Sequence, residues 1–218
     1  PDFEAFLNEW NSLYESRSGE RGIFNRVASQ KQAARNGRRD PEQDFGCNPC
    51  SEIILKPNQF CNLTEVVVRP DDTVETLKEK VKYATILGTF QATLTDFRYL
   101  RKSWSSNTED EALLGVSLTG ILDNPLMTLN NKNLPTVLEW LRNEAIKTNK
   151  IWAETLGINQ SAAITCVKPS GTVSQLVDSA SGIHGRYAPY YIRRVRADSR
   201  DPLCLVLEEA GVPSEIDN

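Results

Sequence analysis

Apolar side chains recur every three or four residues in several stretches of the chain, the spacing that places them on one face of a helix. Over residues 2–13, Phe3, Phe6, Leu7 and Trp10 follow this pattern. Helices are predicted over residues 2–13, 26–35, 72–97, 109–122, 135–156 and 173–179.

Sequence signals mark the starts of two of these helices. Asp72 is followed three residues later by Glu75, which predicts a capping box at the start of the 72–97 helix. Pro135 stands in the first turn of the 135–156 helix, where proline is favoured because its nitrogen needs no intrahelical partner.

Short runs of β-branched residues alternate with these helices. Residues 51–55 and 63–68 are predicted strands, and the segment 56–59 between them, which contains proline and asparagine, predicts a turn. A third strand is predicted over residues 162–167. The mixture of strands and helices indicates an α/β class.

The region from Ser16 to Asp44 is polar and rich in arginine. We interpret it as a surface loop that contains the short 26–35 helix and a turn at residues 19–22. Its basic side chains form either a solvated surface or a phosphate-facing one, and both alternatives stay open.

The bulk composition is that of a globular protein, because 39% of the 218 residues are hydrophobic and 25% are charged. A net charge of -4 and an isoelectric point near 5.2 argue against general nucleic-acid binding, since no overall positive field would attract a phosphate backbone. No apolar run reaches the roughly 18 residues that a membrane-spanning helix needs. We therefore expect no membrane partner and no direct contact with nucleic acid.

The chain has five cysteines, an odd number, and is long enough to fold without disulfide bonds. Reduced thiols in a cytoplasmic protein are expected, and clustered thiols are then more often catalytic or metal-binding than structural. Because the chain begins with Pro1 rather than methionine, we expect a fragment, one domain over residues 1–218 that is incomplete at both ends.

Three cysteines and two polar residues gather in one short stretch: Cys47, Asn48, Cys50, Glu52 and Cys61. A closed zinc site needs four ligands, usually from two Cys-x-x-Cys pairs, and one pair is present, so we expect no metal. A thioredoxin-like redox pair needs a βαβ setting, whereas here a predicted strand follows the motif. A catalytic centre and a buried free cysteine beside a surface glutamate stay open as alternatives.

The spacing of three of these residues is that of one strand face. Pro49 biases Asn48 towards an extended backbone, and residues two apart in an extended segment share a face. We therefore expect Asn48, Cys50 and Glu52 to point the same way, so that an amide, a thiol and a carboxylate can touch one substrate.

A second motif, Pro169-Ser170-Gly171-Thr172, stands between a predicted strand and a predicted helix that begins at Val173. A helix N-terminus offers unpaired backbone N–H groups and a partial positive charge, both suited to phosphate. An ordinary capped helix start has the same composition, so that alternative also stays open.

Asn-x-Cys-x-Glu followed by another cysteine resembles the active-site loop of the large chain of ribonucleotide reductases. The closest resemblance is to the adenosylcobalamin-dependent class, particularly its monomeric triphosphate-reducing branch. The matching segments are Asn48-Pro49-Cys50-Ser51-Glu52-Ile53, Phe60-Cys61-Asn62-Leu63-Thr64-Glu65, Lys168-Pro169-Ser170-Gly171-Thr172-Val173-Ser174-Gln175 and Ala188-Pro189-Tyr190-Tyr191-Ile192-Arg193-Arg194.

The resemblance implies a role for each matching residue. Cys50 would hold the thiyl radical that removes the ribose 3′ hydrogen, and Glu52 would accept the proton of the 3′ hydroxyl. Asn48 would hydrogen-bond the substrate or Glu52. Cys61 would be one of two thiols that reduce the substrate and end as a disulfide, and its partner lies upstream in the family, outside these residues. Residues 169–173 would bind the substrate's phosphates.

No role follows for the other cysteines. Cys47 could not replace the upstream partner without moving the active-site segment. Cys166 and Cys204 lie in apolar surroundings and are predicted to be buried packing residues.

The resemblance also implies part of a ten-stranded α/β barrel, with the Cys50 segment as a central loop. It implies adenosylcobalamin as cofactor, a ribonucleoside triphosphate as substrate, and a thioredoxin-type reductant and the rest of a parent polypeptide as partners. The chain alone is then expected to be inactive. Two alternatives stay open: the large chain of an iron-dependent ribonucleoside-diphosphate reductase, and a non-catalytic binding or structural domain.

Overall fold

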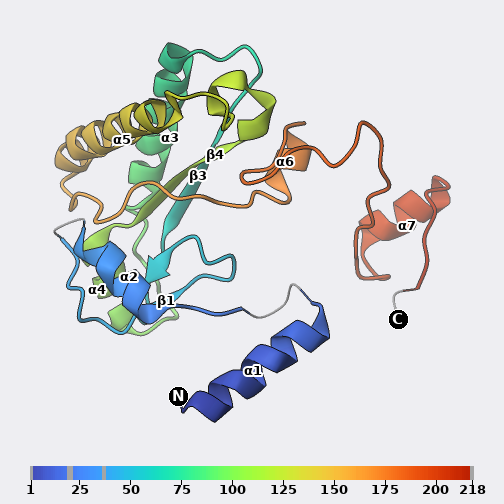
Figure 1. Ribbon diagram of the computed structural model, residues 1–218, viewed down its shortest axis with the longest axis horizontal. Helices are drawn as coiled ribbons and strands as arrows, with labels where there is room; N and C mark the ends of the chain where they lie inside the picture. The colour runs from blue at the N-terminus through green and yellow to red at the C-terminus, as the bar shows by residue number, and fades with distance from the viewer. Residues whose placement is uncertain (1, 19–21, 36–37, 217–218) are drawn as a thin grey trace. The chain divides into compact units, whose positions relative to one another are not determined.

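The computed structural model describes residues 2–18, 22–35 and 38–216, so most of the turn predicted at 19–22 lies outside the described residues (Figure 1). The chain divides into two units, Pro1–Gly185 and Arg186–Asn218. The expectation of one incomplete domain over residues 1–218 stays a prediction.

The first unit mixes helices and strands along the chain, which confirms the α/β class. Its elements are α1 (Phe3–Ser16), α2 (Arg26–Ala34), β1 (Gly46–Cys47), β2 (Ile54–Leu55), β3 (Asn62–Val67), α3 (Val74–Gln91), α4 (Lys102–Glu111), β4 (Leu114–Thr119), the 3-10 turns η1 (Ile121–Asp123) and η2 (Pro125–Met127), α5 (Leu134–Leu156) and α6 (Val173–Leu176). The helices predicted at 2–13, 26–35 and 135–156 are confirmed, as is a short one after residue 172.

A parallel pair of strands forms the centre of this unit. β3 and β4 pair from Asn62↔Leu114 to Val67↔Thr119, with α3 and α4 in the connection between them. The two described sheets have two strands each, so the ten-stranded barrel is retained only as a proposal.

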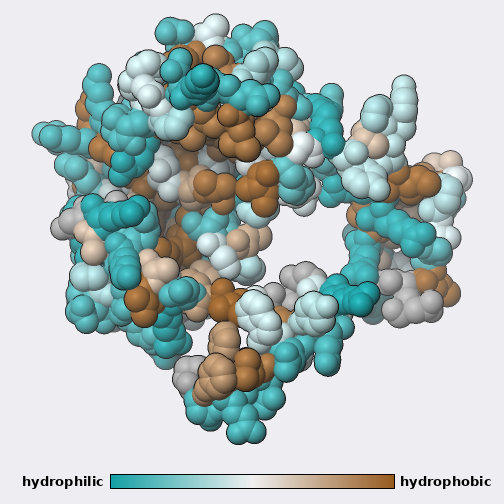
Figure 2. Space-filling model, viewed as in Figure 1, coloured by the Kyte–Doolittle hydropathy of each residue, from teal (hydrophilic) through white to brown (hydrophobic). Residues whose placement is uncertain are grey.

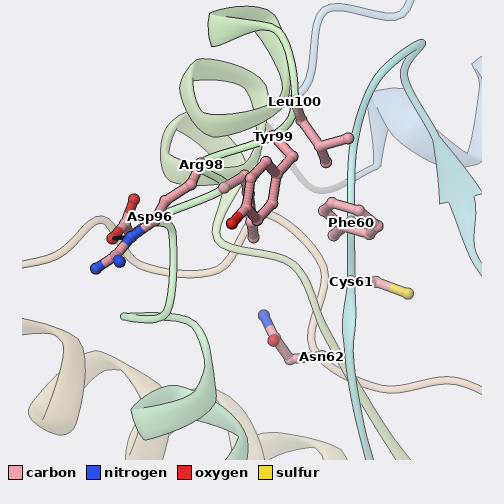
Figure 3. A pocket seen from close by; sticks show the side chains of 8 residues that line it. Phe60, Cys61, Asn62, Asp96, Arg98, Tyr99 and Leu100 are labelled. Carbon is pink, nitrogen blue, oxygen red and sulfur yellow. Dashed lines mark hydrogen bonds and ion pairs between the residues drawn. The ribbon is translucent and has the colours of Figure 1, made fainter.

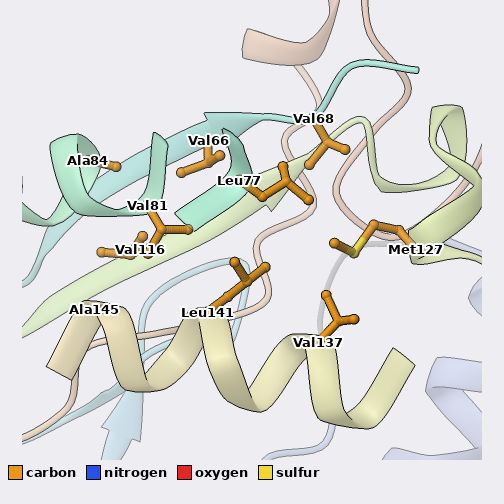
Figure 4. Close-up of a cluster of buried hydrophobic side chains, with 10 residues drawn as sticks. All are labelled: Val66, Val68, Leu77, Val81, Ala84, Val116, Met127, Val137, Leu141 and Ala145. Atoms are coloured by element: carbon orange, nitrogen blue, oxygen red, sulfur yellow. The ribbon is translucent and has the colours of Figure 1, made fainter. Parts of the chain in front are cut away.

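The main hydrophobic core lies between β3, β4 and the two long helices α3 and α5 (Figure 4). Its buried members are Val66, Val68, Leu77, Val81, Ala84, Val116, Met127, Val137, Leu141 and Ala145. Full burial of one large aliphatic side chain contributes about 1.5–3 kcal/mol, so this layer fixes the position of the strands.

The predicted 162–167 strand is present as an extended segment along the other edge of β4. The Val116 N–H donates to the Ile164 carbonyl at 2.8 Å, and the Cys166 N–H donates to the Val116 carbonyl at 3.1 Å. A single parallel bridge pairs Val116 with Thr165. β4 therefore has a neighbour on each side.

The helix predicted over 109–122 is wrong for most of its length. α4 ends at Glu111, Ala112 adopts a left-handed backbone with φ 42°, and the following residues form β4. All residues of β4 except Leu118 are buried, because both faces and both edges of this strand are covered. The sequence of such a strand is a run of apolar residues without polar alternation, and its periodicity does not distinguish it from a buried helix.

The capping box of α3 is shifted by one residue from its predicted place. Thr73 is the N-cap, and its hydroxyl and that of Thr76 each accept a hydrogen bond from the other's backbone N–H, at 3.3 and 3.0 Å. Asp72 instead accepts from the Lys80 ammonium at 2.6 Å. α3 ends at Gln91, before the predicted limit at 97.

A short antiparallel hairpin carries the cysteine-rich segment. β1 pairs with β2 through Gly46↔Leu55 and Cys47↔Ile54, which leaves residues 48–53 as the loop of the hairpin. Of the predicted 51–55 strand, the last two residues are a strand. The turn predicted at 56–59 is confirmed, with the Gln59 side chain accepting the Lys56 N–H at 2.8 Å.

The second unit contains α7 (Pro202–Glu209), which begins at an Asp201 cap and buries no residue. α1 in the first unit also buries none. Hydrophobic side chains are visible at the surface in Figure 2, and exposed examples on these two helices include Phe3, Trp10, Leu203 and Val206. Within the described part of the chain, no helix is both long and apolar enough to cross a membrane.

Candidate active site

The loop of the β1–β2 hairpin is a tight turn and not an extended segment. The Ser51 N–H donates to the Asn48 carbonyl at 2.9 Å, and Ser51 has a left-handed φ of 60°. The Asn48 side chain closes the loop by accepting the Ile53 N–H at 3.0 Å. Asn48, Cys50 and Glu52 are therefore not three positions on one strand face, and that prediction is wrong. Asparagine is favoured at the first and proline at the second position of a β-turn, so the chain reverses after Asn48 whatever backbone Asn48 itself adopts.

Cys50 lies in this turn and is exposed. Among the described residues, no hydrogen bond joins its thiol to another group. Cys47, at the end of β1, has its sulfur 3.4 Å from the Ser51 hydroxyl oxygen. The structure thus presents Cys50, and not Cys47, as an accessible thiol.

Glu52 leads from the turn back towards the core. Its Oε2 atom is buried and has no hydrogen-bond partner among the described residues. A buried polar atom without a partner costs about 1–3 kcal/mol, more for a charged group. Such atoms are rare in native proteins and need an explanation such as catalysis or an absent ligand.

Cys61 and Cys166 lie in one small apolar cluster near this carboxylate. Both pack against the cluster formed by Ile53, Leu113 and Ala162, and both are half-buried. Burial and the nearby negative charge of Glu52 raise the pKa of the Cys61 thiol.

The pKa of Cys166 is shifted further. Burial, the charge of Glu52 and the presence of Cys61 raise the pKa of the Cys166 thiol to about 12. Both cysteines are therefore protonated thiols at neutral pH. The prediction that Cys166 and Cys204 are buried packing residues is wrong for burial, because both are half-buried, although Cys166 does pack in this cluster. No signal in the sequence indicated the place of Cys166 beside Cys61; the parallel pairing of the 162–166 segment with β4 brings the two together.

Gly115 in β4 leaves the space that this cluster fills. A Cβ atom there would overlap the Leu63 side chain and lie 2.9 Å from Ile53 Cδ1 and 3.1 Å from the Cys166 sulfur. A side chain at this position would therefore force the ends of Leu63 and Ile53 to move, and glycine is favoured here by close side-chain packing and not by its φ angle.

The predicted phosphate motif forms a strained turn before α6. Ser170 has a left-handed φ of 54° and is 1% exposed, whereas Gly171 and Thr172 are exposed. The Gly182 N–H donates to the Pro169 carbonyl at 3.0 Å and closes the segment. Thr172 makes no side-chain capping bond to α6, so the alternative of an ordinary side-chain-capped helix start loses support.

Glu65 joins this turn to the sheet. Its carboxylate accepts hydrogen bonds from the Thr119 hydroxyl at 2.7 Å and from the Ser170 hydroxyl, and lies 3.6 Å from the Lys168 ammonium. The sequence prediction missed Glu65, although its period-two spacing from Cys61 would have placed both on one strand face.

A buried ion pair anchors the base of the hairpin. The Arg39 guanidinium donates to both Glu111 carboxylate oxygens, at 2.9 and 2.8 Å, and both side chains are 2% exposed. Gln59 also donates to Glu111, at 2.6 Å. The segments before β1 and after β2 are therefore fixed to the end of α4.

An open pocket of about 550 Å³ lies beside Cys61 (Figure 3). Its wall includes the aromatic residues Phe60, Phe97 and Tyr99 together with polar and charged ones such as Asp96 and Arg98. In Figure 3 the Cys61 sulfur points away from the side on which Asn62 projects. The lining includes Cys61 but none of Cys50, Glu52 and Ser170, so this pocket does not unite the candidate residues.

Over the residues that the structure describes, no group of three or more histidine, cysteine, aspartate or glutamate side chains is arranged to hold a metal ion. The candidate site is therefore composed of thiols, two carboxylates and a strained turn.

Comparisons with known proteins give one consistent result, although no family model matches the chain. An adenosylcobalamin-dependent ribonucleoside-triphosphate reductase of Lactobacillus acidophilus is 32% identical over 79% of this chain and 26% of that protein. Proteins of the same name from Levilactobacillus brevis and Lacticaseibacillus paracasei are 31% and 27% identical over 92% and 94% of the chain.

The fold gives the same relationship. A crystal structure of a B12-dependent (class II) ribonucleotide reductase matches with a TM-score of 0.54 and 27% identity, over 81% of this chain and 27% of that one. The chain spans 26 to 31% of the length of these three curated relatives.

Proposed function

Given that the chain is homologous to a segment of the adenosylcobalamin-dependent ribonucleotide reductases, we propose that it carries part of the catalytic site of such an enzyme. The reaction is the reduction of a ribonucleoside triphosphate to the deoxyribonucleotide. It consumes two thiols and yields water and one disulfide, so that hydrogen atoms and electrons balance.

Cys50 is proposed as the thiyl residue that removes the ribose 3′ hydrogen. Adenosylcobalamin, when bound, supplies an organic radical that can oxidise a thiol. The position of Cys50 fits this chemistry because its thiol is exposed on a turn and no described residue is hydrogen-bonded to it. Asn48 holds the turn through the Ile53 N–H, so its proposed role is to position the loop as well as the substrate.

The observation that carries the proposal is the unpartnered, buried Oε2 atom of Glu52. A substrate hydroxyl that donates to this atom would satisfy it, and Glu52 would then accept the 3′ proton as general base. A packing role gives no reason for a carboxylate oxygen to be buried without a donor.

Cys61 is proposed as one of the two reducing thiols. Its raised pKa keeps the proton on sulfur at neutral pH, which suits a group that must deliver hydrogen to the substrate as the 2′ hydroxyl leaves as water. A dithiol of the thioredoxin type then reduces the resulting disulfide.

Residues 169–173 are proposed to bind the substrate's phosphates. The exposed Gly171 and Thr172 and the absence of a side-chain cap at the start of α6 support this role over an ordinary capped helix. The tight backbone closure of the turn, through Gly182 and Pro169, supports it further because a fixed backbone loses little freedom when a ligand binds.

The test uses the full-length polypeptide that contains this chain, with adenosylcobalamin, a ribonucleoside triphosphate and a dithiol. We expect deoxyribonucleotide formation, its loss in Cys50→Ser, and a fall in kcat of about 10²-fold or more in Glu52→Gln. Cys204→Ser, in α7 of the second unit, is the matched cysteine control and should keep full turnover. Undiminished turnover in Cys50→Ser, or turnover without cobalamin, would contradict the proposal.

A further inference from the structure

Glu65 is a nine-tenths buried carboxylate that the proposed reaction does not use. Its partners come from three places: Thr119 at the end of β4, Ser170 in the turn before α6, and Lys168 just ahead of that turn. A buried charge is retained only where it is paired and hydrogen-bonded, and these three partners meet that requirement.

Ser170 is the partner whose conformation needs an explanation. A left-handed φ of 54° is strained at a residue other than glycine, and such a residue persists only when its surroundings hold it in place. Two hydroxyl hydrogen bonds do so here: Ser170 donates to Glu65, and Ser174 donates to the Ser170 carbonyl. The first of these bonds is charge-assisted and is the stronger type.

Resting on the function proposed above, we propose that Glu65 is a positioning residue that locks Ser170 in its strained conformation and so fixes the turn that receives the substrate's phosphates. Glu65 acts through Ser170 and does not touch the substrate. Lys168, whose ammonium lies 3.6 Å from the Glu65 carboxylate, balances the charge of Glu65, so this carboxylate repels a bound phosphate less than an unpaired one would.

Two substitutions distinguish the hydrogen-bond acceptor of the Glu65 side chain from its negative charge. Glu65→Gln keeps an oxygen that can accept the Ser170 hydroxyl, and frees Lys168 to attract an anion. Glu65→Ala removes the acceptor and lets Ser170 leave the left-handed region. We therefore expect Glu65→Ala to raise the KM for the ribonucleoside triphosphate about tenfold, which corresponds to one lost charge-assisted hydrogen bond. We expect kcat to change less than about threefold, and Glu65→Gln to keep KM within about threefold of the wild type.

A double-mutant cycle with Ser170→Gly tests the route of action. Glycine adopts a positive φ without strain, so Glu65→Ala should weaken binding much less in the Ser170→Gly background. Equal effects in the two backgrounds would overturn the proposal, because Glu65 would then act independently of Ser170. Thr119→Val is the matched control, since it removes another donor to the same carboxylate oxygen and leaves the Ser170 bond in place.

Two further measurements on the full-length polypeptide do not depend on turnover. In Glu65→Ala, amide hydrogen exchange should accelerate over residues 169–176, and the affinity for inorganic triphosphate measured by calorimetry should fall about tenfold. In Thr119→Val both should stay close to the wild type. Faster exchange with unchanged triphosphate affinity, or equal acceleration in the two variants, would overturn the positioning role. Absence of ribonucleotide reduction in the wild type would instead refute the proposed function, and the exchange and affinity results would still decide the role of Glu65.

Discussion

At the scale of single residues, burial and one neighbouring carboxylate together set the pKa of the Cys61 thiol. Burial raises this pKa most, and the negative charge of Glu52 raises it further because it disfavours the thiolate. Glu52→Gln removes the charge and leaves the burial, so the pKa of Cys61 should fall but stay above that of a free thiol.

This first prediction is measured as the pH dependence of Cys61 alkylation, followed by mass spectrometry of the labelled peptide. The alkylation profile of Cys61 should move to lower pH in Glu52→Gln. Glu65→Gln is the control, because Glu65 raises the pKa of Cys166 but is not among the causes of the Cys61 shift. An unmoved Cys61 profile in Glu52→Gln would show that the carboxylate does not act on this thiol.

The candidate residues could be named from the sequence, but the local backbone around Cys50 could not be derived by alternation alone. The motif identified Asn48, Cys50 and Glu52, and the extended geometry assigned to them was wrong. The hydrogen bond from Ser51 to Asn48 and the positive φ of Ser51 make a turn. The Asn-Pro pair at the start of the loop contained that information, since proline favours the second position of a turn.

At the scale of secondary-structure elements, the packing of β4 against its neighbours depends on the absence of a side chain at Gly115. Alanine at this position would overlap Leu63 and crowd Ile53 and Cys166. Overpacking of this kind costs about 1–3 kcal/mol. The second prediction is that Gly115→Ala lowers the free energy of unfolding by this amount in chemical denaturation of the full-length protein.

Gly46→Ala in β1 is the matched control for this prediction, because a Cβ atom there meets nothing within 4 Å. Its free energy of unfolding should stay within about 0.5 kcal/mol of the wild type. If the two variants were equally stable, the close packing around Gly115 would have no energetic importance.

The hairpin that carries Cys50 depends on the Arg39–Glu111 pair. Removing one partner of a buried pair costs about 3–5 kcal/mol when the other charge is left uncompensated; without Arg39, Glu111 keeps Lys56 at 3.4 Å and the Gln59 amide, so we expect the lower end of this range. The third prediction is that Arg39→Ala destabilises the protein by about 3 kcal/mol and accelerates exchange in residues 46–59. Arg142→Ala, which breaks an exposed pair with Glu139, should cost less than about 1 kcal/mol. Similar costs for the two variants would argue against an anchoring role.

Elements with one buried face were predicted well, and the element buried all round was not. α3 and α5 show the helical period because one side of each packs on the sheet. β4 has a parallel neighbour on either side, and its apolar run contains no alternation from which to identify a strand. The pairing of the strands could not be predicted either, because the local sequence of β2 or β3 does not indicate which strand each one pairs with.

At the scale of the whole molecule, the chain holds some of the groups that the proposed reaction needs. The described residues bring Glu52, Cys61 and Cys166 into one neighbourhood, and Glu65 ties the phosphate turn to the sheet. The pocket beside Cys61 takes in neither Cys50 nor the turn. This pocket therefore does not unite the radical thiol, the base, the reducing thiol and the phosphate site.

This arrangement leads to the fourth prediction, that the 218-residue chain by itself does not reduce ribonucleotides. The chain spans only 26 to 31% of the relatives' length, and catalysis by positioning is lost when the reacting groups are not held together, since an error of about 1 Å can cost about 10²-fold in rate. The isolated chain, given adenosylcobalamin, a ribonucleoside triphosphate and excess dithiol, should form no deoxyribonucleotide above a Cys50→Ser control. The full-length polypeptide should turn over under the same conditions. Turnover by the isolated chain that disappears in Cys50→Ser would show that these residues already assemble a complete site, and that the exposed thiol reaches Glu52 and Cys61 without further protein around it.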